Sequence, residues 1–388
     1  MTEGDAAPQF ELSAAQQAIF EMARGFADTR LAPRALEWDE RKIFPIEVIR
    51  ETAALGMAGI YVRESSGGTG LSRLDATLIF EALATGCPTI AAYISIHNMV
   101  AWMIDRYGDA EQRARFLPDL ISMRTLASYC LTEPGCGSDA AALTTRARRD
   151  GDAYVLDGTK QFISGAGATD LYLVMARTGG AGAGGVSCFI VPCDAAGLSF
   201  GANERKMGWN AQPTRQVVLD GVRVPRALRL GGEGDGFRIA MSGLDGGRLN
   251  IGACSLGGAR KALERGIDYA ATRRAFGRRL DEFQALQFRL ADMATALETA
   301  RVMLWHAAAA LDRGGPAARQ LCAMAKRVAT DNGFDIANQA LQLLGGYGYL
   351  ADYGIEKIVR DLRVHQILEG TNEIMRLIVA RGLIGEGS

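Results

Sequence analysis

Residues 281–311 read DEFQALQFRLADMATALETARVMLWHAAAAL. Large apolar side chains recur through this stretch close to heptad spacing, which is typical of an α-helix with one buried face. These positions are Phe283, Leu286, Leu290, Met293, Leu297, Leu304 and Leu311. Asp281 is expected to cap the start of the helix. An apolar stripe of this length predicts a helix that packs beside others in a bundle.

The segments around this helix extend the same pattern. Residues 315–346 begin with Pro316 near a first turn and end on Gly345-Gly346, which predicts a second long helix. Residues 243–259, GLDGGRLNIGACSLGGA, carry many glycines in a helical context. Because each glycine in a helix costs about 1 kcal/mol relative to alanine, so many of them predict close approach by another helix or a ligand.

The rest of the chain divides into a helical and a strand-rich part. Residues 1–125 contain helical patterns, with Ser13 as a plausible N-cap and Gly86 as a plausible C-cap. Residues 126–235 are rich in Thr, Val, Tyr and Gly. Asp157-Gly158 and Asp220-Gly221 are hairpin signals, and the Gly-rich 179–185 segment predicts a hairpin tip. No long helical pattern intervenes, so these strands are expected to pair antiparallel in a barrel or a sandwich.

Composition limits the classes of protein to consider. The chain has 388 residues, a formal net charge of −1, 48% hydrophobic and 22% charged residues. These values fit a soluble globular protein of two or three domains that does not bind nucleic acid or membranes by bulk charge. The start, MTEGDAAPQFELS, has neither a signal-peptide nor a transit-peptide profile. We therefore expect a cytoplasmic protein, or one of the mitochondrial matrix if a presequence was removed.

Cysteine and histidine usage argues against metal sites and disulfides. The seven cysteines are scattered without a CxxC pair, and the three histidines, His97, His306 and His365, form no metal-binding motif. If the chain performs acid–base chemistry, a Glu, Asp, Lys or Tyr side chain is expected to carry it.

Residues 367–376, ILEGTNEIMR, place Glu369 between an apolar pair and a Gly-Thr-Asn turn. One interpretation is a surface glutamate at a helix end. The other is a base held in a dry pocket, above a ligand that the following backbone also contacts. The residues alone leave both open.

Other segments are individually ambiguous. The loop 128–143, SYCLTEPGCGSDAAAL, is either a polar cradle for a ring edge or phosphate, or a plain connection. Residues 160–167, KQFISGAG, are either a platform for a flat ring or a strand entering a turn. Asp245 and Arg248 suit an ordinary i,i+3 ion pair. Residues 342–350, QLLGGYGYL, lack the preceding strand that a dinucleotide-binding fingerprint requires.

Taken in order, these segments resemble the acyl-CoA dehydrogenase family over essentially the whole chain. The resemblance rests on YCLTEPGCGSD (129–139), FGRRLDEFQALQFRLADM (276–293) and ALQLLGGYGYLADYGIEKIVRDLRVHQILEGTNEIMR (340–376). It implies an α+β multidomain fold. The expected domains are an N-terminal α-helical domain (1–125), a middle antiparallel β-barrel-like domain (126–235) and a C-terminal four-helix bundle (236–388).

The resemblance also implies a reaction, the α,β-dehydrogenation of an acyl-CoA thioester with FAD as cofactor. Glu369 would be the catalytic base, with its pKa raised by a dry site, and the β-hydrogen would leave as hydride to flavin N5. Some branches of the family place the base on an earlier helix, where this chain has Gly247. The thioester oxygen would be held by the Glu369 amide and a flavin ribityl hydroxyl.

The family motifs map onto particular cofactor and substrate residues. FAD contacts are expected at Tyr129, Cys130, Leu131, Thr132, Gly137, Ser138, Phe162, Ile163, Ser164, Arg273, Phe283, Gln284, Thr371, Asn372 and Glu373. Gln342, Leu343, Leu344, Gly345 and Gly346 would come from a neighbouring subunit. For CoA, the candidates are Ser138, Asp245, Arg248, Gly370 and Arg381. Phe283, Glu373 and Arg381 suit simple helix surface equally well.

Two stretches, 91–105 and 208–219, most resemble the family branch that acts on isobutyryl-CoA in valine breakdown. A short α-branched acyl group is therefore expected, with 2-methylbutyryl-CoA or butyryl-CoA as alternatives. The family implies a homotetramer that passes electrons to electron-transferring flavoprotein. A member acting mainly as a non-catalytic binding or assembly protein, and an oxidase, are the competing interpretations.

Overall fold

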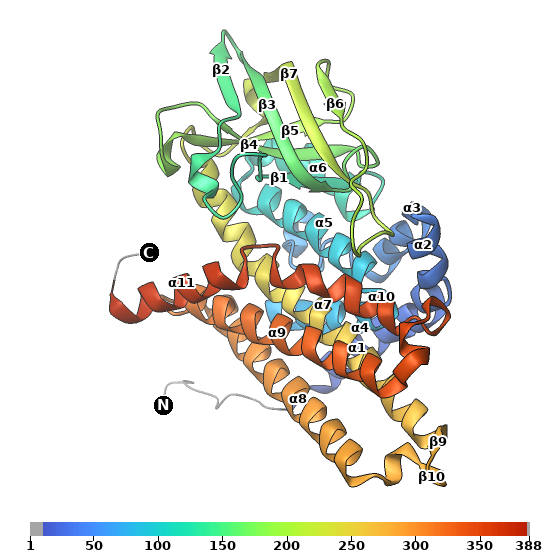
Figure 1. Cartoon of the computed structure of the whole chain (residues 1–388). Coiled ribbons are helices and arrows are strands. Elements are labelled where there is room, and N and C mark those ends of the chain that lie inside the picture. The colour runs from blue at the N-terminus through green and yellow to red at the C-terminus, as the bar shows by residue number, and fades with distance from the viewer. Residues whose placement is uncertain (1–10, 386–388) are drawn as a thin grey trace.

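The computed structural model describes residues 11–385, with the main sheet at one end of the molecule, helices forming most of the rest and a short two-stranded ribbon at the other end (Figure 1). The acidic start of the chain, on which the targeting prediction rests, lies largely outside these residues. None of the helices within residues 11–385 combines the length and the hydropathy that a membrane span requires.

The N-terminal helices are α1 (Ala14–Phe26), α2 (Ala35–Arg41), α3 (Ile46–Glu51), α4 (Arg73–Gly86), α5 (Pro88–Tyr107) and α6 (Ala110–Ile121). Ser13 caps α1 as predicted, because the Gln16 amide donates to its hydroxyl at 3.2 Å and the Gln16 side chain accepts from its amide. Gly86 is the last helical residue of α4, and Cys87 takes the cap position instead. A Cβ at Gly86 would lie 2.6 Å from the Ala27 carbonyl oxygen, so close packing explains this glycine.

Eight strands of the described chain form one sheet between α6 and α7. They are β1 (Ala127–Cys130), β2 (Arg146–Asp150), β3 (Ala153–Ser164), β4 (Leu171–Arg177), β5 (Val186–Pro192), β6 (Leu198–Phe200), β7 (Thr214–Pro225) and β8 (Arg229–Leu230). Their order is β6-β7-β3-β2-β4-β5-β8, with β1 paired to β4. Most pairs are antiparallel, as predicted, but β1 and β2 each run parallel to β4. The 179–185 segment joins β4 to antiparallel β5, which confirms that hairpin.

The Asp-Gly pairs do not form hairpin turns, and this prediction is wrong. β3 runs unbroken through Asp157-Gly158 and β7 through Asp220-Gly221, and the two strands pair with each other. Their register shifts at Gly158, and the Gly221 amide donates to the Asp157 carboxylate at 2.8 Å. Gly221 has a φ of 65°. An Asp-Gly pair serves a bulge as well as a turn, because both need a left-handed residue.

The C-terminal helices are α7 (Gly236–Thr272), α8 (Gln284–Arg313), α9 (Ala318–Leu344), α10 (Ile355–Arg363) and α11 (Asn372–Ile384), with a ribbon of β9 (Arg274–Ala275) and β10 (Arg278–Arg279) after α7. Asp281 does not cap α8, contrary to the prediction. It lies in a 3-10 turn ahead of Phe283, which occupies the cap position, and it pairs with Arg279 at 2.9 Å. The predicted stripe does face inward, with Met293, Leu297 and Leu304 buried.

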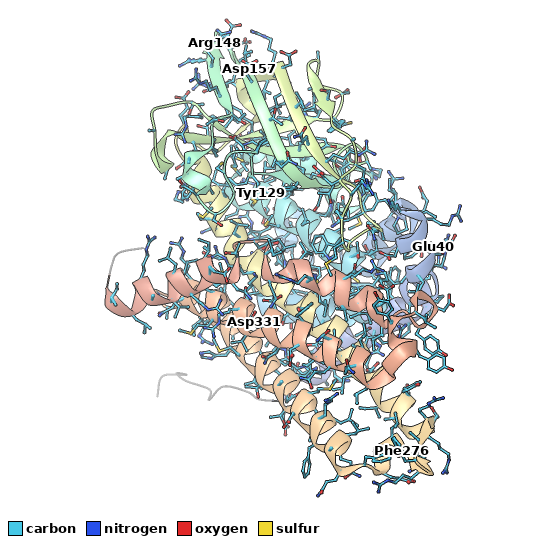
Figure 2. The ribbon with its side chains drawn as sticks, in the orientation of Figure 1. Glu40, Tyr129, Arg148, Asp157, Phe276 and Asp331 are labelled. Atoms are coloured by element: carbon cyan, nitrogen blue, oxygen red, sulfur yellow. The ribbon has the colours of Figure 1, made fainter. Side chains whose placement is uncertain are left out.

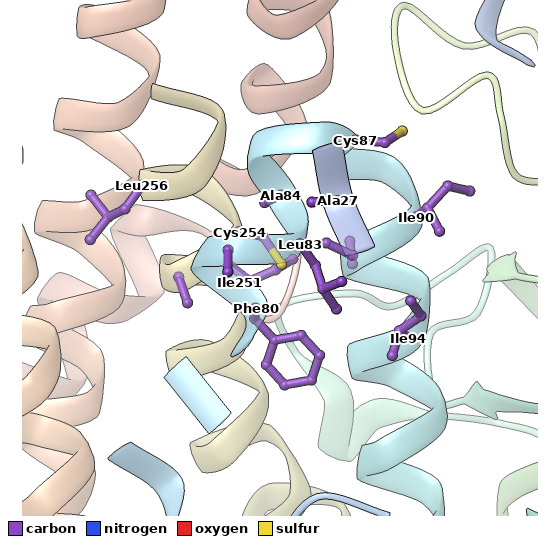
Figure 3. Close-up of a cluster of buried hydrophobic side chains, with 14 of the residues drawn as sticks. Ala27, Phe80, Leu83, Ala84, Cys87, Ile90, Ile94, Ile251, Cys254 and Leu256 are labelled. Carbon is purple, nitrogen blue, oxygen red and sulfur yellow. The ribbon is translucent and has the colours of Figure 1, made fainter. Parts of the chain in front are cut away.

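One apolar core joins the N-terminal helices to the C-terminal bundle. Figure 3 shows Phe80, Leu83 and Ala84 of α4 beside Ile251 and Cys254 of α7, and all five side chains are inaccessible to solvent. A second core lies between the sheet and helices α5 and α6. Helices α5 and α7 contribute residues to both cores, so these two helices connect the sheet to the bundle.

Candidate active site

Glu369 lies in the turn between the 3-10 segment Val364–Gln366 and α11. Its backbone is left-handed, with a φ of 56°, and that of Gly370 follows with a φ of 91°. Such a conformation costs a residue with a side chain about 1–2 kcal/mol. Thr371 then caps α11, accepting a hydrogen bond from the Ile374 amide at 3.3 Å. Strain held at a carboxylate favours a functional position over an ordinary helix end.

The Glu369 carboxylate packs directly on α7. A Cβ at Gly247 would lie 2.0 Å from Glu369 Oε2 and 2.8 Å from Cδ. Oε2 is buried and accepts no hydrogen bond from any group in residues 11–385. Burial raises the pKa of Glu369 to about 7, although the charges of Arg248 and Lys326 pull that pKa down. A buried carboxyl that titrates near neutral pH with an unengaged oxygen has the properties of a general base.

Two buried cations hold the backbone of this turn. Arg248 of α7 donates from Nε to the Glu369 carbonyl oxygen at 3.3 Å, and Lys326 of α9 donates from Nζ to the Gly370 carbonyl oxygen at 3.0 Å. The Glu369 amide donates to no backbone acceptor in the described part of the chain. The turn therefore fixes its two peptide planes and leaves one N–H for an oxygen atom of a ligand.

Sequence reasoning missed Lys326, which is completely buried. Its Nζ also donates to Asn372 Oδ1 at 2.8 Å. The Asn372 amide group in turn donates to Asp331 at 2.7 Å and to Thr330 at 3.0 Å. Asn372 was expected to touch the cofactor, and the structure engages its side chain with α9.

Asp245 and Arg248 form an ion pair at 2.5 Å, as their spacing indicates. The pair is more than a surface contact, because the side chains are only 18% and 4% exposed and Arg248 also holds the Glu369 carbonyl. Ser138 and Arg381, the other CoA candidates, are exposed and make no hydrogen bond or ion pair with Asp245 or Arg248. The structure thus joins Asp245, Arg248 and the Glu369–Gly370 turn through direct contacts.

A second buried arginine was also missed. The Arg73 guanidinium lies 3.7 Å from the ring centroid of Tyr61 and 4.7 Å from that of Trp102. It packs on α7 at Gly246, where a Cβ would lie 2.3 Å from Nη1. The glycines of α7 therefore admit side chains from other segments, as their number predicts. Gly246 admits Arg73, and Gly247 admits Glu369.

A buried ion pair between Lys160 and Glu133 anchors the loop after β1. Lys160 Nζ lies 2.8 Å from Glu133 Oε1, and the Thr144 and Thr145 amides donate to the same carboxylate at 2.6 and 2.9 Å. Breaking such a pair by removing one partner costs about 3–5 kcal/mol. The loop that carries Thr132 and Ser138 is therefore held rigidly at its base.

The predicted flavin-loop residues differ in exposure. Cys130 and Leu131 are buried, Tyr129 and Thr132 are half-buried, and Gly137 and Ser138 are exposed. The Tyr129 hydroxyl is buried without a hydrogen-bond partner in residues 11–385. Figure 2 places Tyr129 where the sheet meets the helices.

Phe162 occupies a bulge in β3. The register of β3 against β7 shifts between Lys160 and Ile163, and Phe162 has a φ of 60°. Phe162 is 63% exposed, whereas Ile163 beside it is buried. The Ser164 carbonyl accepts from the Ser128 hydroxyl at 2.6 Å. The bulge thus turns one aromatic ring outward from the sheet, which suits contact with a flat ligand.

The remaining candidates gather at the far end of the bundle, where Figure 2 labels Phe276. A pocket of about 350 Å³ lies there, lined by Tyr269, Arg273, Leu280, Leu343, Leu344, Gly345, Gly346, Tyr347 and Leu350. Gln342, Phe283 and Gln284 are outside this lining, although Arg278 stacks 3.9 Å from the Phe283 ring centroid. The structure therefore brings Arg273 together with the Gly345-Gly346 corner and keeps both away from Tyr129 within one chain.

Three predicted contacts near α11 lie on its surface or start. Gly370 belongs to the Glu369 turn, whereas Glu373 is 81% exposed and Arg381 is exposed. Glu373 lies 3.6 Å from Arg376 in an i,i+3 pair. Both side chains are thus exposed in the described chain.

The histidines do not extend the site. His365 is buried and accepts a hydrogen bond on Nε2 from Trp209 Nε1 at 3.3 Å. Burial and the charge of Lys326 lower its pKa to about 3, so it remains neutral and serves packing. Burial also lowers the pKa of His97, to about 4. Within residues 11–385, no group of three or more His, Cys, Asp or Glu side chains is placed to hold a metal ion.

Three family models match the chain in succession. They are the N-terminal domain of acyl-CoA dehydrogenase at residues 13–124, the middle domain at 128–222 and the C-terminal domain at 234–384. The chain is 52% identical to the mitochondrial isobutyryl-CoA dehydrogenase of Bos taurus, over 98% of this chain and 91% of the relative.

Solved structures agree with this match. The butyryl-CoA dehydrogenase of Megasphaera elsdenii has a TM-score of 0.94 and 37% identity, over 97% of this chain and all of that one. A glutaryl-CoA dehydrogenase from Mycobacterium smegmatis, in complex with FADH2, has a TM-score of 0.91 and 30% identity, over 97% of this chain and 96% of that one.

Proposed function

This chain belongs to the acyl-CoA dehydrogenase family, whose members are FAD-dependent enzymes acting on a CH–CH bond, and we propose that it dehydrogenates a short branched acyl-CoA with Glu369 as the base. The observation that carries this assignment is the Glu369 carboxylate. It stands on a left-handed turn, packs on Gly247, has an unengaged buried oxygen and a pKa near 7. Gly247 of α7 stands at the position where some branches of the family place the base, and it faces this same carboxylate.

Each group of the turn has a defined task in this proposal. Glu369 takes the proton from the carbon next to the thioester carbonyl. The Glu369 amide donates to the thioester oxygen and stabilises the negative charge that develops there. Bound FAD supplies the acceptor for the β-hydrogen, which leaves as hydride. Arg248 and Lys326 hold the two carbonyls so that the amide and the carboxylate keep their directions.

The residues around the sheet fit a flat cofactor. Phe162 presents an outward ring on a bulge, and Tyr129 carries a buried hydroxyl without a partner. We infer that Thr132 and Ser138, on the loop anchored by Lys160, bind the same group. Arg273 and the Gly345-Gly346 corner line one pocket, and Arg273 directly precedes β9, which lies at the end of the bundle opposite the sheet (Figure 1). They would therefore bind the cofactor of a neighbouring subunit.

We infer isobutyryl-CoA as the substrate. The chain is 52% identical to a relative named for that acyl group, against 37% for a butyryl-CoA dehydrogenase. The two acyl groups have the same number of carbons and differ in branching, so pocket shape rather than polarity must separate them. A hydrophobic pocket discriminates such differences by only about 1–3 kcal/mol, so butyryl-CoA and 2-methylbutyryl-CoA are expected to react more slowly.

An anaerobic scan of acyl-CoAs from C3 to C8, straight and branched, tests this assignment. Isobutyryl-CoA should bleach the flavin fastest, about 10-fold or more ahead of butyryl-CoA. Faster bleaching by butyryl-CoA would reassign the acyl group. Protein that binds FAD but bleaches with no acyl-CoA would contradict the dehydrogenase assignment, and stoichiometric peroxide in air would indicate an oxidase. Protein that takes up no FAD would indicate a binding or assembly role.

We also infer a homotetramer that transfers electrons to electron-transferring flavoprotein. Large apolar side chains lie exposed beside the Gly345-Gly346 pocket, with Tyr349 83% and Phe276 96% exposed. Exposed aromatic groups of this size are typical of a surface that another subunit covers. Sedimentation should give four times the mass of the 41.5 kDa chain, and a monomer that binds FAD fully would contradict the inferred assembly.

A further inference from the structure

Lys326 occupies an unusual position for a lysine. It lies on α9, is inaccessible to solvent, and directs its ammonium group to the turn that carries Glu369. Nζ donates to the Gly370 carbonyl oxygen at 3.0 Å and to Asn372 Oδ1 at 2.8 Å. Lysine is almost never fully buried unless its charge is compensated. The contacts of its ammonium group must therefore account for a lysine at this buried position.

The contacts of Lys326 are neutral acceptors rather than a carboxylate. Within the described residues no Asp or Glu oxygen lies within 4 Å of its Nζ, in contrast to buried Lys160 and Lys357, which pair with Glu133 and Asp361 at 2.8 and 2.5 Å. The buried positive charge is thus not neutralised by a direct ion pair. Among the charged groups acting on it, Glu369 has the largest effect.

We propose that Lys326 is a positioning residue for Glu369, which fixes the left-handed turn through the Gly370 carbonyl and holds a buried positive charge that favours the ionised carboxylate. This inference rests on the proposed role of Glu369 as the base. Arg248 holds the preceding carbonyl from α7, so the turn is clamped from two helices. The charge of Lys326 acts on a carboxylate that has no hydrogen-bond donor of its own on Oε2 within residues 11–385.

The electrostatics of the site agree with this geometry. Burial alone raises the pKa of Glu369, and the cations Arg248 and Lys326 oppose that rise. The pKa of Lys326 falls to about 8, first through burial, and Glu369 partly restores it. Asp331 and Glu373 also raise the pKa of Lys326, while Arg248 lowers it. The other titratable groups whose charges interact with Glu369 are Tyr61 before α4, Tyr129 of β1 and Cys254 of α7.

The sign of the expected effect follows directly. A cation near a carboxylate stabilises its ionised form, so removing the cation raises the carboxyl pKa. Fewer molecules then carry an ionised base at a given pH below neutrality. The acidic limb of the rate profile, which reports the free-enzyme base in kcat/KM, must therefore move to higher pH.

Two substitutions separate the charge of Lys326 from its hydrogen bond. Lys326→Met removes both, and Lys326→Gln keeps a donor for the Gly370 carbonyl without the charge. Infrared titration of the protonated carboxyl band, with Glu369→Gln as the subtraction control, follows residue 369 without requiring turnover. Both variants should move its titration, and the acidic limb of flavin reduction, up by about one pH unit. Lys326→Met should in addition reduce flavin about 10-fold more slowly than Lys326→Gln, because the turn loses its anchor.

Thr330→Val supplies the matched control. It removes the hydroxyl that contacts Asn372 on the same face of α9 and leaves the charge of Lys326 in place. Its carboxyl titration should equal that of the wild type. An unchanged titration in Lys326→Gln or Lys326→Met, or an equal shift in Thr330→Val, would overturn the role of Lys326. Wild-type protein whose residue 369 titrates near neutral pH, but whose flavin no acyl-CoA reduces, would instead refute the proposed function alone.

Discussion

Glu369→Gln is expected to keep bound FAD and to lose flavin reduction by isobutyryl-CoA about 10³-fold. Removing a general base typically costs about 10²–10⁴-fold, and the expected loss lies in the middle of this range. Glutamine has nearly the same volume, so it should occupy the space over Gly247 without disturbing the turn. The measurement is anaerobic stopped-flow bleaching at saturating substrate, with FAD content determined on the same sample.

The control for this substitution is Glu47→Gln, which removes a carboxylate that is 86% exposed on α3. Its bleaching rate should match the wild type. Reduction of Glu369→Gln at the wild-type rate would mean that another group takes the proton. Helix α7 offers none at residue 247, where the chain has glycine, so such a result would remove the central assignment.

The helical bundle was predictable because its evidence is local. The repeat of apolar residues along 281–311 indicates which face of the helix is buried. Met293, Leu297 and Leu304 are buried on that face in the structure. The start of the same helix was not predictable. Asp281 has the right residue type for a cap, but the β9–β10 ribbon delivers the chain in a 3-10 turn that places Phe283 there instead. Residue propensity indicates which residue types can cap a helix. It does not determine at which residue the helix begins.

The sheet shows the opposite case, in which a strong local signal misled. Asp157-Gly158 and Asp220-Gly221 have turn chemistry, but each lies inside a long strand whose partner is the other strand. Whether an Asp-Gly pair forms a turn or a bulge depends here on the pairing of β3 with β7. The residues next to each Asp-Gly pair do not specify which strand becomes the partner.

The site divides in the same way. Glu369 could be identified from its motif, and the structure adds the burial that raises its pKa. Lys326 and Arg73 were not identified, because the contacts that make them important come from segments far away in the sequence. A signal did exist for Lys326. It stands one helical turn from Cys322 and Thr330 on the face of α9 that the structure buries, where a lysine is out of place.

Gly247→Ala is expected to slow flavin reduction about 10²-fold while leaving the fold intact. The added Cβ would lie 2.0 Å from Glu369 Oε2, which is far inside any allowed contact. The turn cannot retreat as a unit, because Arg248 and Lys326 hold its two carbonyls. The carboxylate must therefore rotate away from the position over α7, and a displacement of about 1 Å at a reacting group costs about 10²-fold in rate.

The stability of Gly247→Ala should change little, which separates the two effects. Alanine gains about 1 kcal/mol of helix propensity over glycine, and overpacking costs about 1–3 kcal/mol. Gly266→Ala is the matched control, since it gains the same propensity on α7 and its Cβ would meet Leu343 and Ala340 at ordinary distances of 3.5 and 3.6 Å. The measurements are bleaching rate and melting temperature for both variants. A Gly247→Ala enzyme that reduces flavin as fast as Gly266→Ala would show that the carboxylate has room to move, and that a fixed base over α7 is not how this site works.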